Sequence, residues 1–394
     1  VGADVDWQTV KTGDTTMVAG QGYFVNTTSS AITMTLPSSA SRGDTIAIKD
    51  YAGTFGSNNC TIARNGHNIQ GNANNSLLTN NRATAFLVYV DSTKGWLYVL
   101  SRNVGDLQKA LHTEATGGTV TTSGDFKIHT FTGDGNFVVS QVGNSPVPGA
   151  GPANADYLVV AGGGGGGHNR GSGGGGAGGH RTTFPSPGCN AGAFPISVQT
   201  YPITVGGGGG QQTSAGAAGN SGSNSVFSTI TSAGGGGGGG SSNAGLNGGS
   251  GGGGGATVNN TYAAGSGNTP PVSPPQGNNG GSASGGPGGN QAGGGGGGAG
   301  AVGANASGNN NAGNGGAGTA NSITASSVTR AGGGGGGATG YETCGHEGSG
   351  GSGGGGRGSG GTAGSANEPS EASVAGTANT GGGGTGAQYP SNTG

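Results

Sequence analysis

The sequence predicts a mainly β protein in two parts: a small domain of the β-sandwich or prism-like kind, then β-strands that feed a glycine-rich bundle. Two observations support this fold class. Only 19 of the 105 glycines lie within residues 1–161, so the rest crowd into the second part of the chain. Short runs of alternating apolar or β-branched residues recur along the whole chain, and several lead directly into straight glycine segments. We expect a β-domain at 1–103, a connector at 104–117, a strand framework at 118–161 and a glycine-rich domain at 162–394.

The first part alternates as half-buried strands do. "ITMTL" places Ile32, Met34 and Leu36 on one face, and "TIAIKD" does the same for Ile46 and Ile48. "FLVYV" and "GWLYVL" follow, and the residues between them, 91–94, are typical of a hairpin turn. About a hundred residues can bury a modest core. We expect its large members to be Trp7, Tyr23, Phe86 and Trp96, with Leu87 or its neighbours beside them.

The connector "VGDLQKALHTEATG" is the one stretch that could form a short helix, because Leu107 and Leu111 are spaced i, i+4. The framework then reads "FKIHTF", "TGDGN" and "FVVS". Asp134-Gly135 is a typical two-residue hairpin signal, so we expect the strands on either side of it to pair.

Strands lead into glycine at four places. "DYLVVA" precedes the run that starts at Gly162, and "YPITV" precedes 206–210. "VFSTITSA" precedes 234–240, and "SSVTRA" precedes 332–337. The spacing is irregular, which excludes a solenoid of fixed repeat.

The glycine runs can be a flexible linker or an ordered bundle. A linker would not need the valines and isoleucines that enter the runs, so we favour order. Bare glycine segments interact only through N–H and C=O groups, and a polyglycine II-type helix with three residues per turn directs these groups outward on three sides. Six residues would span about 19 Å at a rise of about 3.1 Å. A strict G-X-Y period is absent, which excludes collagen, and no aspartate follows Asp156, which excludes a calcium-binding β-helix.

Composition excludes several classes of function. Net charge is −2 and charged residues make up 7%, which gives no electrostatic footprint for nucleic acid or an anionic membrane. No apolar run is long enough to span a bilayer. Cys60, Cys189 and Cys344 have no metal or redox spacing; a Cys189–Cys344 disulfide stays open, but we expect free thiols.

No cofactor or metal is expected. "GSGGGG" at 171–176 matches a nucleotide-binding pattern, as such a glycine-rich segment does by chance. The polar residues His168, His180, Cys189, Cys344 and His346 lack the spacing of a zinc site. Glu342 and Glu347 could form the carboxylate pair of a glycosidase, but nothing indicates a cleft, so we expect binding without catalysis.

A rigid scaffold that presents variable loops is the usual geometry of a binding protein. We expect the loops at 182–200, 256–280, 338–347 and 362–372 to gather at the ends of the bundle. An aromatic ring beside hydrogen-bonding groups can recognise a sugar ring, and packing within the protein is the alternative role for each aromatic residue. The candidate receptor-binding residues are Tyr262, Tyr341, His346, Glu347, Phe184 and Phe194.

Two segments resemble a known kind of protein. The stretch from "WQTVKTGDTTMVAGQGYFVN" to "LVYVDSTKGW" (7–96) resembles a small β-domain of bacteriophage tail fibres. "FKIHTFTGDGNFVV…ADYLVVAGGGGGG" (126–167) and the later glycine runs resemble the glycine-rich domain that often follows it. The resemblance implies an extracellular, virion-attached adhesin, usually a homotrimer joined to other tail proteins, that binds a bacterial surface glycan or protein. It identifies no receptor residues.

Two alternatives stay open. The chain could be a structural filament or surface-coat protein of a bacterium, with the glycine slab as its material. A polysaccharide depolymerase is the third reading, and it would need the carboxylate pair described above.

Overall fold

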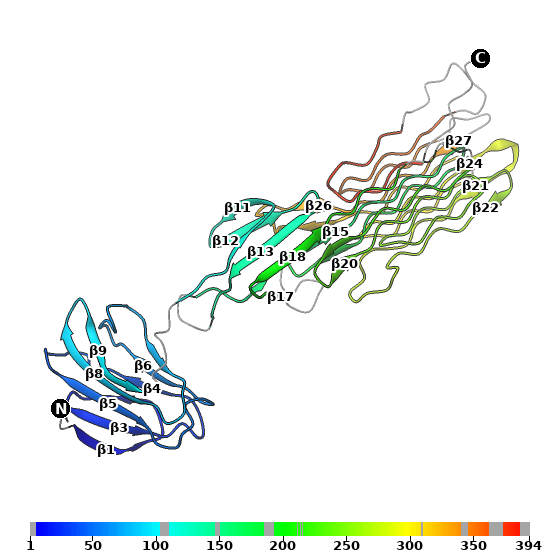
Figure 1. The fold of residues 1–394 in the computed structure, drawn as a ribbon. Helices are drawn as coiled ribbons and strands as arrows, with labels where there is room; N and C mark the ends of the chain where they lie inside the picture. The colour runs from blue at the N-terminus through cyan, green and yellow to red at the C-terminus, as the bar shows by residue number, and fades with distance from the viewer. Residues whose placement is uncertain are drawn as a thin grey trace. The chain divides into compact units, whose positions relative to one another are not determined.

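The computed structural model describes residues 5–102, 110–145, 150–184, 193–210, 212, 214, 216–308, 310–339, 346–361 and 373–386. The chain forms two compact units. The first comprises Val1–His112 and Gly143–Pro152, and the second comprises Thr113–Val142 and Ala153–Gly394. Secondary structure in the described residues is β, apart from the short 3-10 turn Pro287–Gly289 (Figure 1). No helix in this part of the chain could cross a membrane.

The first unit is a sandwich of two sheets. The larger sheet has the strand order β1-β3-β5-β8-β9, and the smaller has the order β2-β4-β6-β7. The larger sheet contains β1 (Asp6–Lys11), β3 (Gln21–Val25), β5 (Thr45–Asp50), β8 (Thr84–Asp91) and β9 (Gly95–Arg102). The smaller contains β2 (Thr15–Thr16), β4 (Ile32–Thr35), β6 (Cys60–Ala63) and β7 (Ser76–Leu78).

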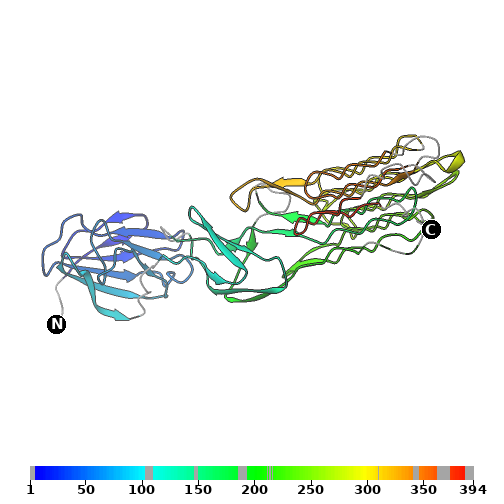
Figure 2. The same ribbon diagram turned by 90° about the horizontal axis from the view of Figure 1, so that it is seen from above.

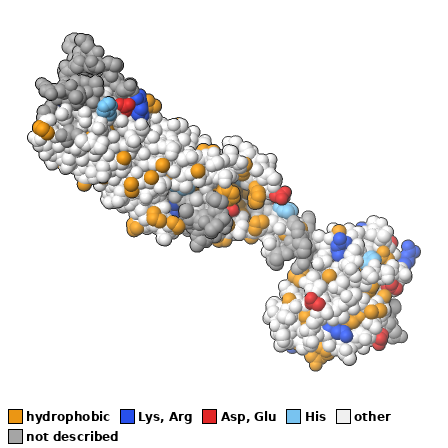
Figure 3. Space-filling view, turned by 180° about the vertical axis from the view of Figure 1, so that it is seen from behind, with side chains coloured by type: hydrophobic (Ala, Val, Ile, Leu, Met, Phe, Trp, Pro, Cys, Tyr) orange, Lys and Arg blue, Asp and Glu red, His pale blue; other side chains and the backbone are white. Residues whose placement is uncertain are grey.

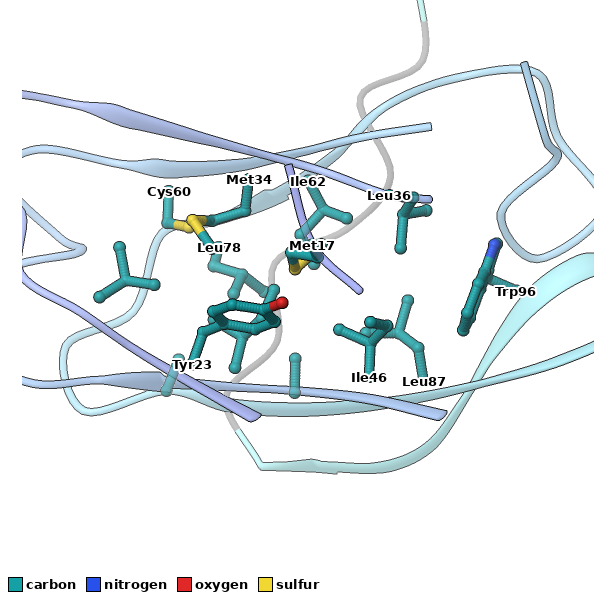
Figure 4. Close-up of a cluster of buried hydrophobic side chains, with 14 of the residues drawn as sticks. Met17, Tyr23, Met34, Leu36, Ile46, Cys60, Ile62, Leu78, Leu87 and Trp96 are labelled. Carbon is teal, nitrogen blue, oxygen red and sulfur yellow. The ribbon is translucent and has the colours of Figure 1, made fainter. Parts of the chain in front are cut away.

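The core of this unit lies between the two sheets (Figure 4). The predicted core residues Ile32, Met34, Leu36, Ile46, Ile48, Leu87 and Trp96 are all buried, each at most 2% exposed, which confirms the alternation argument. The predicted turn at 91–94 is also confirmed, because β8 and β9 pair and Asp91 accepts hydrogen bonds from the amides of Thr93 and Lys94.

Two large residues predicted for the core lie elsewhere. Trp7 is 44% exposed and stacks on Phe24, with ring centroids 4.6 Å apart. Phe86 is half-buried, because β8 alternates and its neighbours Ala85 and Leu87 point into the core. The prediction was wrong for Trp7 because β1 is the edge strand of its sheet and is largely exposed. It was wrong for Phe86 because "FLVYV" is apolar on both faces, so the pattern does not say which face is inside.

The second unit begins with a framework sheet of order β10-β13-β18-β19-β20. Its strands are β10 (Glu114–Thr116), β13 (Gly135–Gln141), β18 (Gln199–Thr204), β19 (Ser225–Phe227) and β20 (Ile230–Ser232). A small apolar core covers one face of this sheet, formed by Val139, Tyr157, Val159, Ile196, Tyr201 and Phe227.

The framework corrects two predictions. Asp134-Gly135 does not join a hairpin: β11 (Thr119–Ser123) pairs with β12 (Phe126–Thr130) around Gly124-Asp125, whereas β13 pairs with β10 and β18. Part of the possible connector helix, at 114–116, is strand β10, and its residues 104–109 lie outside the described part.

Short strand pairs cap the glycine segments of this unit. Beside the framework lie β14 (Asn154–Ala155) with β17 (Phe194–Pro195), β15 (Leu158–Val160) with β16 (His180–Thr182), and β25 (Thr319–Asn321) with β26 (Val328–Arg330). At the opposite end lie β21 (Ala256–Thr257) with β22 (Asn260–Thr261), and β23 (Ser284–Gly285) with β24 (Gln291–Ala292) and β27 (Ala338–Thr339). We call these the near end and the far end of the glycine array, which fills the space between them (Figures 1 and 2).

Candidate functional site

The glycine array is held by backbone hydrogen bonds that rotate among neighbours. In the segment 173–179, the amides of residues 173, 176 and 179 donate to residues 239, 236 and 233. Those of 174 and 177 donate to 294 and 297, and those of 175 and 178 donate to 384 and 381. The donor–acceptor distances are 2.7–3.0 Å. Every third amide therefore binds the same neighbour.

The carbonyl groups of this segment are used in the same way. Amides of the segments 161–167, 250–253 and 334–337 donate to carbonyl groups of residues 172–179. The segment is buried along its whole length, although it contains almost no side chains. The predicted bundle of glycine runs lying side by side is confirmed by these bonds.

Glycine is required here by space. A Cβ atom built at Gly174 or Gly175 would overlap the carbonyl group of Gly334 or Gly164. The same holds along the runs 234–240 and 293–298, where backbone atoms of neighbouring segments occupy the position of every missing Cβ. Interior segments therefore cannot present side chains to a ligand.

Side chains that could contact a ligand are confined to the turns and to the outermost segments. The far end combines the β21–β22 hairpin, the β23-β24-β27 sheet and the turn Ser307–Asn311 (Figure 1). These turns are rich in asparagine and serine, which hydrogen-bond to their own backbone and tolerate tight turns. The surface of this unit carries few charged side chains on the face shown in Figure 3.

Tyr262 lies at the far end, directly after β22. It is half-buried, and its hydroxyl accepts a hydrogen bond of 3.2 Å from the side-chain amide of Asn260. Its own amide donates to Gly255, which ties it to the end of a glycine run. The ring is therefore fixed at its base and has a polar neighbour at its tip.

His346 and Glu347 lie on another turn of the far end. The amide of His346 donates to Asn310, and its carbonyl accepts from Ala312. His346 is exposed, and Glu347 forms an ion pair of 3.0 Å with Arg357. The two side chains of this pair keep 22% and 35% exposure, so the pair stays reachable from solvent.

The structure separates Phe184 and Phe194 from these three. Phe194 lies on β17 at the framework and packs against Tyr201 and Phe227, with ring centroids 6.0 and 4.9 Å away. Phe184 follows β16, where its carbonyl accepts from Asn321. Tyr341 lies outside the described residues, as do Glu342, Cys189 and Cys344.

The described parts of the predicted loops lie at both ends. Residues 256–280 do not form one loop: they make the far-end hairpin, a returning glycine segment, and a near-end turn that contains Gln276. The described part of 182–200 belongs to the near end, and 338–339 to the far end. Residues 362–372 lie outside the described part.

The near end holds a buried polar cluster that the sequence did not single out. Gln276 is 1% exposed; its side chain accepts from the amide of Ala233, and its backbone carbonyl accepts from the amide of His180. Asn321 donates to Thr182. Burial, with a smaller contribution from the positive charge of Arg330, lowers the pKa of His180 to about 4. Isolated Gln and Asn residues in a Gly/Pro/Ser-rich segment give no sequence signal for such a cluster.

No group of three or more potential ligands from His, Cys, Asp or Glu gathers among the described residues. The only described cysteine, Cys60, is a buried free thiol in the first unit.

These features define a class: a protein whose glycine-rich backbone array serves as the scaffold for short polar turns. A family model described as a glycine-rich domain matches residues 140–394. The chain belongs to this family, and the match covers most of the second unit. No curated protein matches the chain.

Proposed function

We propose that this chain is a non-catalytic segment of a bacteriophage tail fibre that binds a bacterial surface receptor, a glycan in the first instance. The supporting observation is that the second unit has different interactions in its interior and at its far end. Its interior is backbone bonded to backbone, whereas its far end carries side-chain-bearing turns. Rigid presentation of variable turns is how binding scaffolds achieve specificity without reorganisation.

The scaffold in this proposal consists of polyglycine II-type helices. The support is the period of three in the hydrogen bonds of 173–179, since a helix with three residues per turn points every third amide in one direction. Strand pairing alternates between two directions and would not reach neighbours on three sides.

In the proposed site, Tyr262 supplies the apolar face for a sugar ring, and His346 with Glu347 supplies hydrogen bonds to hydroxyl groups. Tyr341 is a further candidate from the same stretch of sequence. Phe194 is half-buried in the framework core and Phe184 lies at the near end, so the proposed far-end site does not include them.

The proposed setting follows from the resemblance described above. The chain would act outside the cell as part of the virion, as a homotrimer joined to other tail proteins. The structural filament remains the alternative, and free far-end turns on a particle-attached oligomer would separate the two.

The test is adsorption of the purified chain to candidate host cells and to a panel of their surface glycans. Tyr262→Ala and Glu347→Gln should each weaken binding about tenfold or more, as loss of one ring contact or one charge-assisted hydrogen bond does. Val302→Ala, an exposed position on a near-end turn, is the matched control and should bind normally. Unchanged binding by both far-end variants, with the fold intact, would contradict the proposed site.

The same samples test whether the protein cleaves the glycan. The glycan should keep its chain length after prolonged incubation with the protein. Shortening of the polymer that is lost in Glu347→Gln would favour the depolymerase instead.

A further inference from the structure

Surface segments of the glycine array follow a rule. Glycine recurs at least every third residue and faces inward, whereas side chains stand at the exposed positions between. In one such segment Gly313 and Gly316 are buried, and Asn314 and Ala317 are exposed. Cβ atoms at the two glycines would overlap the carbonyl groups of Ala304 and Ala301.

The segment 245–248 follows the same rule. Gly245 and Gly248 are buried, and Leu246 and Asn247 between them are exposed. A glycine in this array is therefore a mark of close approach by another backbone.

The run 206–210 breaks the rule. Gly206 and Gly209 face inward, where a Cβ would overlap Ser223 and Asn220. Gly207, Gly208 and Gly210 are exposed, yet they are glycine as well. A Cβ at Gly207 would meet nothing within 4 Å, and one at Gly208 would lie 3.6 Å from the carbonyl oxygen of Gly163, an ordinary contact.

Conformation does not require glycine at these positions either. None of the three has a positive φ, so a residue with a side chain could adopt the same backbone. Within the described chain, neither steric crowding nor backbone conformation therefore explains why these three positions are glycine.

The amides of this run supply a second, independent observation. The N–H groups of Gly207, Gly208 and Gly210 donate to no acceptor within the described residues, whereas Gly209 donates to Gly163 at 2.8 Å. Exposed and unpaired backbone donors form an open edge at which a further chain can be added. The array thus ends here with its donors unused.

We propose that a glycine segment of a second copy of this chain docks on 206–210 and continues the array across the interface. A segment with glycine on its inward face approaches as closely as the interior segments do, and this chain itself is rich in such segments. The run also continues directly from β18, whose exposed residues Thr200, Pro202 and Thr204 are uncharged. One exposed carboxylate, that of Asp134, lies beside the start of the run, where it accepts a hydrogen bond of 2.8 Å from the amide of Val205. The inference concerns assembly and does not depend on receptor binding.

The test is sedimentation velocity of the full chain over a range of concentrations. The wild-type chain should self-associate. The double substitution Gly207→Ser and Gly208→Ser should raise the dissociation constant about 100-fold, since it blocks the approach on which the new hydrogen bonds depend. Gly210→Ser alone should also raise the dissociation constant for self-association.

The design separates association from folding. Each of these substitutions fits the monomer, so its thermal unfolding should stay unchanged at low concentration. Ala317→Ser, which adds a hydroxyl to an exposed position on another surface segment, is the matched control and should associate normally. A wild-type chain that remains monomeric, or a double variant that associates as tightly as the wild type, would overturn the proposal. A monomeric wild-type chain would also contradict the proposed homotrimer, but neither result bears on adsorption to host cells, so receptor binding and docking on 206–210 fail separately.

Discussion

The same chemical change should have opposite effects at two glycines of the array. At Gly236, a new Cβ would overlap the carbonyl oxygen of Leu246 and lie 2.6 Å from its carbonyl carbon. An ordinary contact needs 3.4 Å or more, so the carbonyl carbon alone would have to move by about 0.8 Å and the overlapping oxygen by more. At Gly208 the nearest atom is 3.6 Å away, and nothing has to move.

The displacement at Gly236 can be translated into free energy. The displacement disturbs one bond between the two segments, Leu246 to Gly237, and three that tie them to other segments: Gly236 to Ser250, Gly176 to Gly236, and Gly252 to Leu246, each 2.8–2.9 Å long. Each contributes about 1 kcal/mol net, so Gly236→Ala should lower the free energy of unfolding by about 4 kcal/mol. Gly236→Val should be at least as damaging. Gly208→Ala should instead stabilise the monomer by about 0.5 kcal/mol, because it restricts the unfolded chain.

Scanning calorimetry at a dilution at which the chain is monomeric measures both effects. Gly236→Ala should lower the melting temperature of the second unit by roughly 8–16 °C. Both tryptophans of the chain, Trp7 and Trp96, lie in the first unit, so tryptophan fluorescence should report unchanged unfolding there. Equal shifts for Gly236→Ala and Gly208→Ala would refute the packing argument.

Three further predictions concern stability and reactivity. Trp96→Ala should cost the first unit about 3–5 kcal/mol because Trp96 is fully buried, whereas Trp7→Ala should cost less than half as much; urea unfolding followed by circular dichroism compares them. The pKa of His180, about 4 in the folded chain against 6.5 ordinarily, means that only the unfolded chain takes up this proton between these values. Stability of the second unit should therefore fall by about 3 kcal/mol as the pH drops from 6.5 to 4, and His180→Gln should abolish that part of the slope in pH-dependent melting. Burial raises the pKa of Cys60 to about 12, so peptide mapping after iodoacetamide treatment at pH 8 should find Cys60 unlabelled in the native chain and labelled in urea.

The sequence predicted where strands lie along the chain better than which strands pair and which of their faces are buried. Alternation identified Ile32, Leu36, Ile46 and Ile48 as core residues because their strands have one apolar face. It misplaced Phe86, since "FLVYV" is apolar on both faces and only the opposing sheet decides which side is inside. Turn chemistry failed for a similar reason. Gly124-Asp125 and Asp134-Gly135 are comparable local signals, and long-range pairing of β13 with β10 and β18 decided between them.

The sequence predicted that the glycine segments pack closely, but not which turns lie at which end of the array. Glycine permits close packing, and that much follows from composition. Which turns share an end depends on the direction of every segment, so the sequence could not tell that Tyr262 and His346 lie at the far end or that Phe194 does not. One signal was present and unused: the three-residue spacing of glycine in surface segments, as at Gly313 and Gly316, marks the inward face.

Amide hydrogen exchange along the glycine runs tests the central claim most directly, because the proposed scaffold requires order in segments that have almost no side chains. If the array is a rigid lattice, the amides of 173–179 should exchange many orders of magnitude more slowly than an unstructured chain, opening only when the second unit unfolds. Exchange of these amides at the rate of a flexible glycine linker would contradict the lattice and, with it, a rigid scaffold for receptor binding.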